Sequence, residues 1–191
     1  LAWSSGGALA WSSDAGTGSR DAAQRVLSTP IVSNGRIFVL DAVLEVHALD
    51  AQTGSRIWSA ETAPEDEEDG FGGGLVSDGA VVYVAGGHGK ALALNASDGS
   101  VRWQVDLPGP VRSAPALAGG LLLATTADNT IIALNTEDGT RAWIQRGVSE
   151  ATSMLGSPAP AVANDAVISA LTNGDLVVMR ASNGRELWRS S

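Results

Sequence analysis

The sequence has 191 residues, enough to bury a sizeable core, and its formal charge of −9 argues against nucleic-acid binding, which needs a basic face. The same charge does not suit electrostatic binding to an anionic membrane surface. The absence of cysteine excludes disulfides, thiolate metal ligands and a cysteine nucleophile.

The first predicted element is a strand within residues 1–13, LAWSSGGALAWSS. Trp11 lies 47 positions before Trp58, and GALAWSS resembles the last strand of the repeated units that follow. We therefore expect residues 1–13 to supply the outer strand of an incomplete unit whose other strands are missing. The sequence begins at Leu1 without an initiator methionine, so we interpret it as a piece of a longer protein.

Four repeated units follow, over residues 28–60, 72–105, 113–146 and 157–190. Each unit closes with a glycine turn and a tryptophan, and the four tryptophans lie 45, 40 and 45 positions apart. Repeats of this length indicate a propeller or a solenoid. The motif residues of the four units are Gly54, Trp58, Gly99, Trp103, Gly139, Trp143, Gly184 and Trp188.

Each unit divides into four short strands, which in the third unit read SAPALAG, LLLATTAD, TIIALNT and TRAWIQR. The glycine before the last strand, such as Gly139, is expected in the left-handed conformation that other residues reach only with strain. Runs such as AVVYVAGG are apolar on both faces and must be covered on both sides, as in a blade between two neighbours. No segment keeps a helical apolar period for three turns. The sequence therefore predicts an all-β propeller segment of four-stranded antiparallel blades, with about four blades, half of an eight-bladed propeller.

Few residues outside the repeat could carry chemistry. In ETAPEDEEDG (61–70), six of the first nine residues are acidic; we interpret 61–69 as a solvated loop, with a weak calcium site as the alternative. The only histidines, His47 and His88, lie in different units and make a poor metal set. We predict no catalytic residue, no metal site and no cofactor.

The repeated segment carries a family resemblance. ALDAQTGSRIW (48–58) resembles the tryptophan-docking motif of PQQ-like, quinoprotein-type eight-bladed propellers, and the later copies relax it. The resemblance implies that each tryptophan packs across the gap to the next blade, where an indole buries much apolar area and its N–H can reach a carbonyl. A platform on which a sugar or quinone stacks is the alternative role.

Within this superfamily the sequence most resembles the first half of the BamB family of outer-membrane assembly lipoproteins, over nearly the whole chain. EATSMLGSPAPAV (150–162) resembles the loop by which that family contacts the periplasmic domains of BamA, the barrel-inserting subunit. The resemblance places the contact on Ser153, Met154, Leu155 and Gly156. Leu155 stands where a better-studied branch has arginine, so the contact would depend on apolar burial. Adjacent Met and Leu at a turn independently indicate a partner surface; an ordinary loop between blades is the alternative.

The resemblance implies a non-catalytic scaffold of the outer-membrane β-barrel assembly machinery, which docks to BamA and assists outer-membrane protein folding and insertion. It implies a periplasmic location at the inner face of the outer membrane, with any lipid anchor upstream, and unfolded outer-membrane proteins as further partners at blade edges. A generic propeller binding module or sensor domain, and a PQQ-dependent dehydrogenase fragment, are the alternatives. Half a ring exposes two apolar blade faces, so we also expect these open edges to associate with another copy.

Overall fold

The computed structural model describes residues 2–5, 8–13, 28–63, 72–147 and 158–190, and these residues form strands, turns and connections without a helix. Accordingly, the described residues include no helix that could cross a membrane. Most of the acidic segment 61–69 lies outside the described residues, as do the predicted contact residues at 153–156.

Sixteen of the strands form four antiparallel sheets of four strands each, and within each sheet every strand pairs with the next along the chain. The first blade contains β3 (Ile31–Ser33), β4 (Arg36–Leu40), β5 (Glu45–Asp50) and β6 (Arg56–Glu61). The second contains β7 (Gly73–Ser77), β8 (Val81–Gly86), β9 (Lys90–Asn95) and β10 (Val101–Asp106). The third contains β11 (Ala116–Ala118), β12 (Leu121–Thr125), β13 (Thr130–Asn135) and β14 (Arg141–Arg146). The fourth contains β15 (Ala161–Ala163), β16 (Ala166–Ala170), β17 (Leu176–Arg180) and β18 (Glu186–Ser190).

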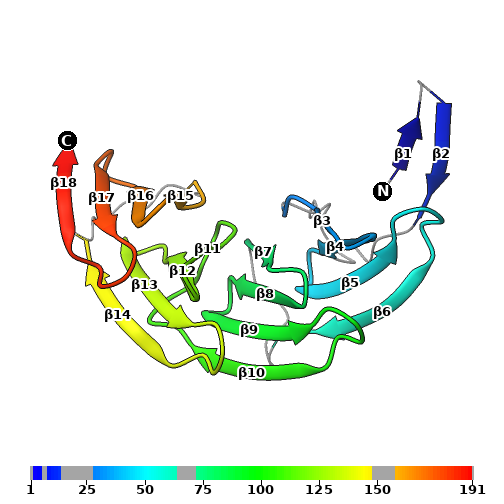
Figure 1. Cartoon of the computed structure of the whole chain (residues 1–191), viewed down its shortest axis with the longest axis horizontal. Helices are drawn as coiled ribbons and strands as arrows, with labels where there is room; N and C mark the ends of the chain where they lie inside the picture. The colour runs from blue at the N-terminus through cyan, green and yellow to red at the C-terminus, as the bar shows by residue number, and fades with distance from the viewer. Residues whose placement is uncertain (1, 6–7, 14–27, 64–71, 148–157, 191) are drawn as a thin grey trace.

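The four blades stand side by side along an arc, with the first strand of each blade on the concave side and the last strand on the convex side (Figure 1). The two ends of the chain lie at the two ends of this arc (Figure 1). The architecture confirms the predicted all-β propeller segment with about four blades, half of an eight-bladed ring.

The core lies between successive blades rather than inside any one of them. Strand β8 is buried along its whole length because its two faces pack on different neighbours, whereas only the tryptophan of the outer strand β10 is fully buried. Three apolar clusters fill the three junctions between blades; they include Phe38 with Leu92, Tyr83 with Leu122, and Leu123 with Met179. Each blade is therefore stabilised by its neighbours, as in other repeat architectures.

The N-terminal segment differs from its prediction. Where a single outer strand was expected, the structure has a hairpin of β1 (Ala2–Ser5) and β2 (Ala8–Ser12). Its register follows that of the outer pair of a blade: Trp3 is opposite Trp11, with a shift directly after, as Ala48 is opposite Trp58 in the first blade. The hairpin thus has the pairing pattern of the last two strands of a blade.

Candidate functional site

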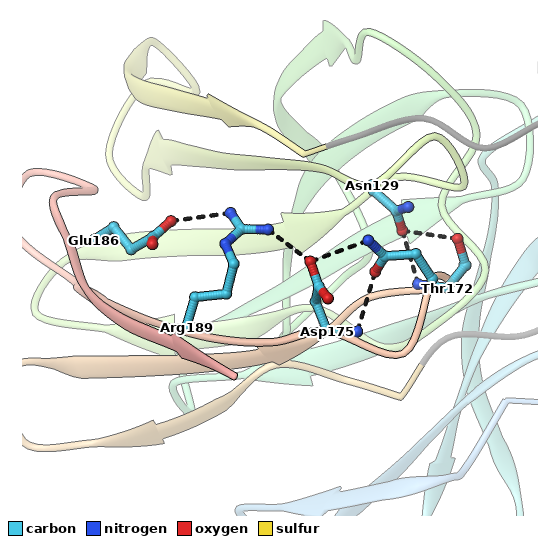
Figure 2. Close-up of polar contacts among 6 residues, drawn as sticks. Asn129, Thr172, Asp175, Glu186 and Arg189 are labelled. Carbon is cyan, nitrogen blue, oxygen red and sulfur yellow. Dashed lines mark hydrogen bonds and ion pairs between the residues drawn. The ribbon is translucent and has the colours of Figure 1, made fainter. Parts of the chain in front are cut away.

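The predicted contact residues Ser153, Met154, Leu155 and Gly156 lie outside the described residues, but the structure describes the surface from which this segment departs. The chain leaves the third blade at Gly147 and re-enters at Pro158, ahead of the buried Pro160. On this side of the arc, the hairpin joining the two middle strands of the third blade (126–130) lies beside its counterpart in the fourth blade (171–175) (Figure 2). We call these two hairpins the third–fourth rim.

Asn129 holds the two hairpins of the rim together. Its Oδ1 accepts hydrogen bonds from the backbone N–H of Thr172 at 2.9 Å and from the Thr172 hydroxyl at 3.0 Å (Figure 2). Asn129 is buried and has a φ of 64°, a left-handed conformation that asparagine tolerates better than most residues. This side chain therefore links the third blade to the fourth through two hydrogen bonds.

The same residue fixes the start of the departing segment. The N–H of Gly147 donates to the carbonyl oxygen of Asn129 at 3.0 Å. A Cβ atom added at Gly147 would lie 2.7 Å from that oxygen, so a side chain cannot be accommodated without movement of the backbone. Glycine at this position allows the backbone of residue 147 to lie against the Asn129 carbonyl.

A second polar group connects the rim to the outer strand of the fourth blade. Arg189 contacts Asp175 at 2.8 Å and Glu186 at 2.9 Å, and the Asn173 amide donates to Asp175 at 3.0 Å (Figure 2). Hydrogen bonds from its guanidinium to Glu186 and then Asp175 raise the pKa of Arg189 above its ordinary value. Arg189 therefore remains a cation at any physiological pH and holds β18 against the hairpin.

In the third blade, the rim carries an ionised carboxylate. Burial raises the pKa of Asp128, but hydrogen bonds from Thr126 and Thr130 outweigh burial, so the pKa lies below its ordinary value. The Thr126 hydroxyl oxygen in turn accepts a hydrogen bond from the N–H of Thr130 at 3.2 Å. The third–fourth rim is thus a polar surface that carries the carboxylates of Asp128 and Asp175, the second of them paired with Arg189 of β18.

The repeated glycines and tryptophans form contacts between blades. In four such contacts the ring of the tryptophan lies against the glycine turn of the blade that follows it, and the turn glycines have φ values of 69° to 77°. A Cβ on the glycine would lie within 2.8 Å of the indole at every contact; the pairs are Trp11 with Gly54, Trp58 with Gly99, Trp103 with Gly139 and Trp143 with Gly184. We call each such glycine turn a seat.

Each indole N–H also donates to a carbonyl oxygen of the turn that carries the seat. The distances are 3.2 Å from Trp11 to Ala51, 3.1 Å from Trp58 to Ala96, 2.9 Å from Trp103 to Thr136 and 2.8 Å from Trp143 to Ala181. The indole thus satisfies its polar atom while its ring buries apolar area. Trp188, in the last outer strand, is half exposed.

The sequence analysis, which treated His47 as isolated, missed a group formed by the buried Asp41 and His47 and the partly buried Glu45. His47 Nε2 lies 3.1 Å from Asp41 Oδ2 and 3.8 Å from Glu45 Oε2. One ligand atom from each residue lies within 4.8 Å of the others, so these three residues could hold a divalent cation. Asp41 Oδ1 already accepts the N–H groups of Val43 and Glu45, which accounts for a buried carboxylate at this turn. The signal in the sequence was the spacing of residues 41, 45 and 47 around one hairpin.

Comparison with known proteins relates the chain to one protein family. The family described as outer membrane protein assembly factor BamB matches over residues 1–65 and 42–191. Outer membrane protein assembly factor BamB of Yersinia pestis is 31% identical over 185 residues, which cover 94% of this chain and 47% of the relative. The chain thus spans about half the length of the curated relatives it matches.

Solved structures show the same fold. The crystal structure of BamB from Moraxella catarrhalis superposes with a TM-score of 0.67 at 19% identity, over 85% of this chain and 50% of the other. Quinohemoprotein alcohol dehydrogenase from Comamonas testosteroni superposes with a TM-score of 0.69 at 19% identity, over 87% of this chain and 35% of the other. At these identities the likeness concerns the fold alone.

Proposed function

Because the chain belongs to the family of outer membrane protein assembly factor BamB, we propose that it is a non-catalytic scaffold of the outer-membrane β-barrel assembly machinery. In this proposal it docks to the periplasmic domains of BamA, the barrel-inserting subunit, and assists the folding and insertion of outer-membrane proteins. Its place of action is the periplasm, at the inner face of the outer membrane.

The observation that carries the docking proposal is the third–fourth rim. Segment 148–157 is bounded by Gly147, which is bonded to Asn129, and by the buried Pro160. Because Gly147 is hydrogen-bonded to Asn129 of the rim, the start of the segment is held in place, and a segment anchored in this way loses less conformational freedom on binding than one on a mobile support. We propose that Ser153, Met154, Leu155 and Gly156 make the contact, with Met154 and Leu155 supplying apolar area.

The proposal is tested by capture on the immobilised periplasmic domains of the BamA of the same organism. Met154→Asp places a charge in the proposed apolar contact and is expected to weaken capture at least tenfold. Val32→Asp is the matched control, because Val32 is 63% exposed on β3 of the first blade, at the far end of the arc. Equal capture of wild type and Met154→Asp would remove the contact from this segment.

The catalytic alternative follows from the fold shared with the quinohemoprotein dehydrogenase. Trp58 and Trp103 are 9% and 8% exposed and lie on the seats of the next blades, so they cannot also stack on a quinone. This burial favours the scaffold over a cofactor platform. Adding pyrroloquinoline quinone and Ca²⁺ tests the alternative: a bound chromophore that is bleached by an alcohol would support a dehydrogenase.

Two further partners belong to this proposal. Outer strands such as β18 present a free edge in the described half ring, to which an extended segment of an unfolded outer-membrane protein could add as another strand. We also propose that apolar blade faces associate with another copy of the chain.

A further inference from the structure

The first blade differs from the other three at the place where β4 turns into β5. Asp41 directly follows β4, Glu45 begins β5, and His47 is two residues further along the same strand. Asp41 and His47 are buried, and Glu45 is partly buried. The residues at the register position of His47 in the other blades are apolar; they are Leu92, Ile132 and Val177. We call Asp41, Glu45 and His47 the acid–histidine group.

A pair of like charges lies at the same end of the first blade. Glu45 of β5 is directly opposite Glu61 of β6. The pair at the same place in the second blade is Lys90 opposite Asp106, and these two side chains form an ion pair at 2.9 Å. Like charges directly opposite one another destabilise a sheet, whereas opposite charges stabilise it. Among the described residues, neither Glu45 nor Glu61 pairs with a lysine or an arginine, so the cation that Lys90 supplies has no counterpart there.

The polar atoms of the acid–histidine group are spaced as the ligands of one cation. His47 Nε2 lies 3.1 Å from Asp41 Oδ2 and 3.8 Å from Glu45 Oε2, and the three atoms lie within 4.8 Å of one another. A tetrahedral Zn²⁺ with bonds of about 2.0–2.2 Å to nitrogen and oxygen keeps its ligand atoms about 3.3–3.6 Å apart.

The surroundings direct these atoms toward one another. Asp41 Oδ1 accepts the N–H groups of Val43 and Glu45, which leaves Oδ2 to face His47. His47 Nδ1 is buried and has no hydrogen-bond partner in the part of the chain that the structure describes, so Nε2 is the nitrogen that meets the carboxylates. Hydrogen bonds of this kind orient the ligands of a metal before it binds.

We propose that Asp41, Glu45 and His47 bind one divalent transition-metal cation, of which Zn²⁺ fits best. An imidazole nitrogen favours Zn²⁺ over Mg²⁺ and Ca²⁺, which take oxygen ligands. The bound cation ties the end of β4 to β5 and offsets the repulsion between Glu45 and Glu61, as Lys90 does opposite Asp106 in the second blade. Its role is structural, and it does not depend on docking to BamA.

The test is isothermal titration calorimetry with Zn²⁺ on the full chain, prepared without a histidine tag and freed of metal with EDTA. Wild type is expected to bind one Zn²⁺ per chain, and to bind it more tightly than Mg²⁺ or Ca²⁺. Glu45→Gln keeps the size of the side chain and leaves the pair of Asp41 and His47 in place. It should raise the Kd for Zn²⁺ at least tenfold, and circular dichroism checks that the variant is folded.

Two control variants separate this site from other acids and from the other histidine. Glu137→Gln removes an exposed acid of the third blade and should leave the Kd unchanged. His88→Gln removes the only other histidine of the chain and should also leave it unchanged. In wild type, NMR of nitrogen-labelled histidines should show Zn²⁺ on Nε2 of His47.

Glu45→Lys gives the first blade the charge arrangement of the second, with a lysine opposite an acid. Its ammonium group takes the place of the cation, so this variant should lose the Zn²⁺ site, and its melting temperature without metal should exceed that of metal-free wild type. The proposal is overturned if wild type takes up no stoichiometric Zn²⁺, if either Glu45 variant binds Zn²⁺ as tightly as wild type, or if His88→Gln abolishes the binding.

Discussion

Substitution of Gly99 measures how much the contact between a tryptophan and its seat contributes to stability. In Gly99→Ala, the new Cβ would lie 2.7 Å from the Trp58 ring, so the indole or the turn must move. Overpacking of this kind costs about 1–3 kcal/mol. The left-handed φ of 77° at Gly99 adds about 1–2 kcal/mol for any residue with a Cβ. The free energy of unfolding should therefore fall by about 2–5 kcal/mol.

Gly120→Ala is the matched control for this measurement. Gly120 has a φ of 80°, but a Cβ added there meets nothing within 4 Å, so this variant carries the backbone cost alone. Urea unfolding followed by circular dichroism gives both free energies. The loss in the free energy of unfolding should be about 1–3 kcal/mol larger for Gly99→Ala than for Gly120→Ala, which is the cost of overpacking. If the two variants lose the same stability, the glycine serves only the turn, and the seat does not require it.

Three further experiments test one left-handed backbone position and two polar contacts. Asn129→Ala should cost about 1–2 kcal/mol more than Asn129→Gly in urea unfolding, because glycine alone keeps the left-handed backbone unstrained; equal losses would contradict this. His47→Leu should lower the free energy of unfolding by about 1–3 kcal/mol, since it removes the hydrogen bond between His47 and Oδ2 of the buried Asp41 carboxylate; an unchanged urea midpoint would show that this pair is not stabilising. Hydrogen bonds from the Thr140 side chain and backbone lower the pKa of Asp138, so its stabilisation is complete above the ordinary carboxyl pKa of about 4 and is lost as the pH falls below it. The free energy of unfolding, measured with urea across this pH range, should therefore decrease less steeply as the pH falls in Asp138→Asn than in wild type. Parallel pH profiles would exclude a contribution from Asp138.

The fold was predictable because its signals are local. Each blade is formed by 30 to 34 consecutive residues, and each pairing within a blade joins strands that are neighbours in the sequence. Apolar runs such as the one in β8 and the regular return of glycine and tryptophan needed no knowledge of distant contacts. The family resemblance was carried by the same residues, and the match over residues 42–191 confirms it.

The polar contacts at the candidate site could not be predicted in this way. Asn129 and Thr172 are 43 residues apart, and nothing in either segment indicates that the two hairpins meet. Their contact depends on how far the third and fourth blades are rotated relative to one another, which the packing of the whole junction sets. The pairing of His47 with Asp41 was missed for a related reason, because it depends on which side of the hairpin each side chain points to.

The tryptophans show most directly what the sequence determines and what the tertiary structure determines. By itself, the sequence determined that an indole and a left-handed glycine recur at one place in every blade, because turn chemistry and strand length are local properties. Along the sequence, Trp58 and Trp188 have nearly the same surroundings. Only the tertiary structure decided that Trp58 is buried and Trp188 is half exposed, since the burial of each indole is supplied by the blade that follows it.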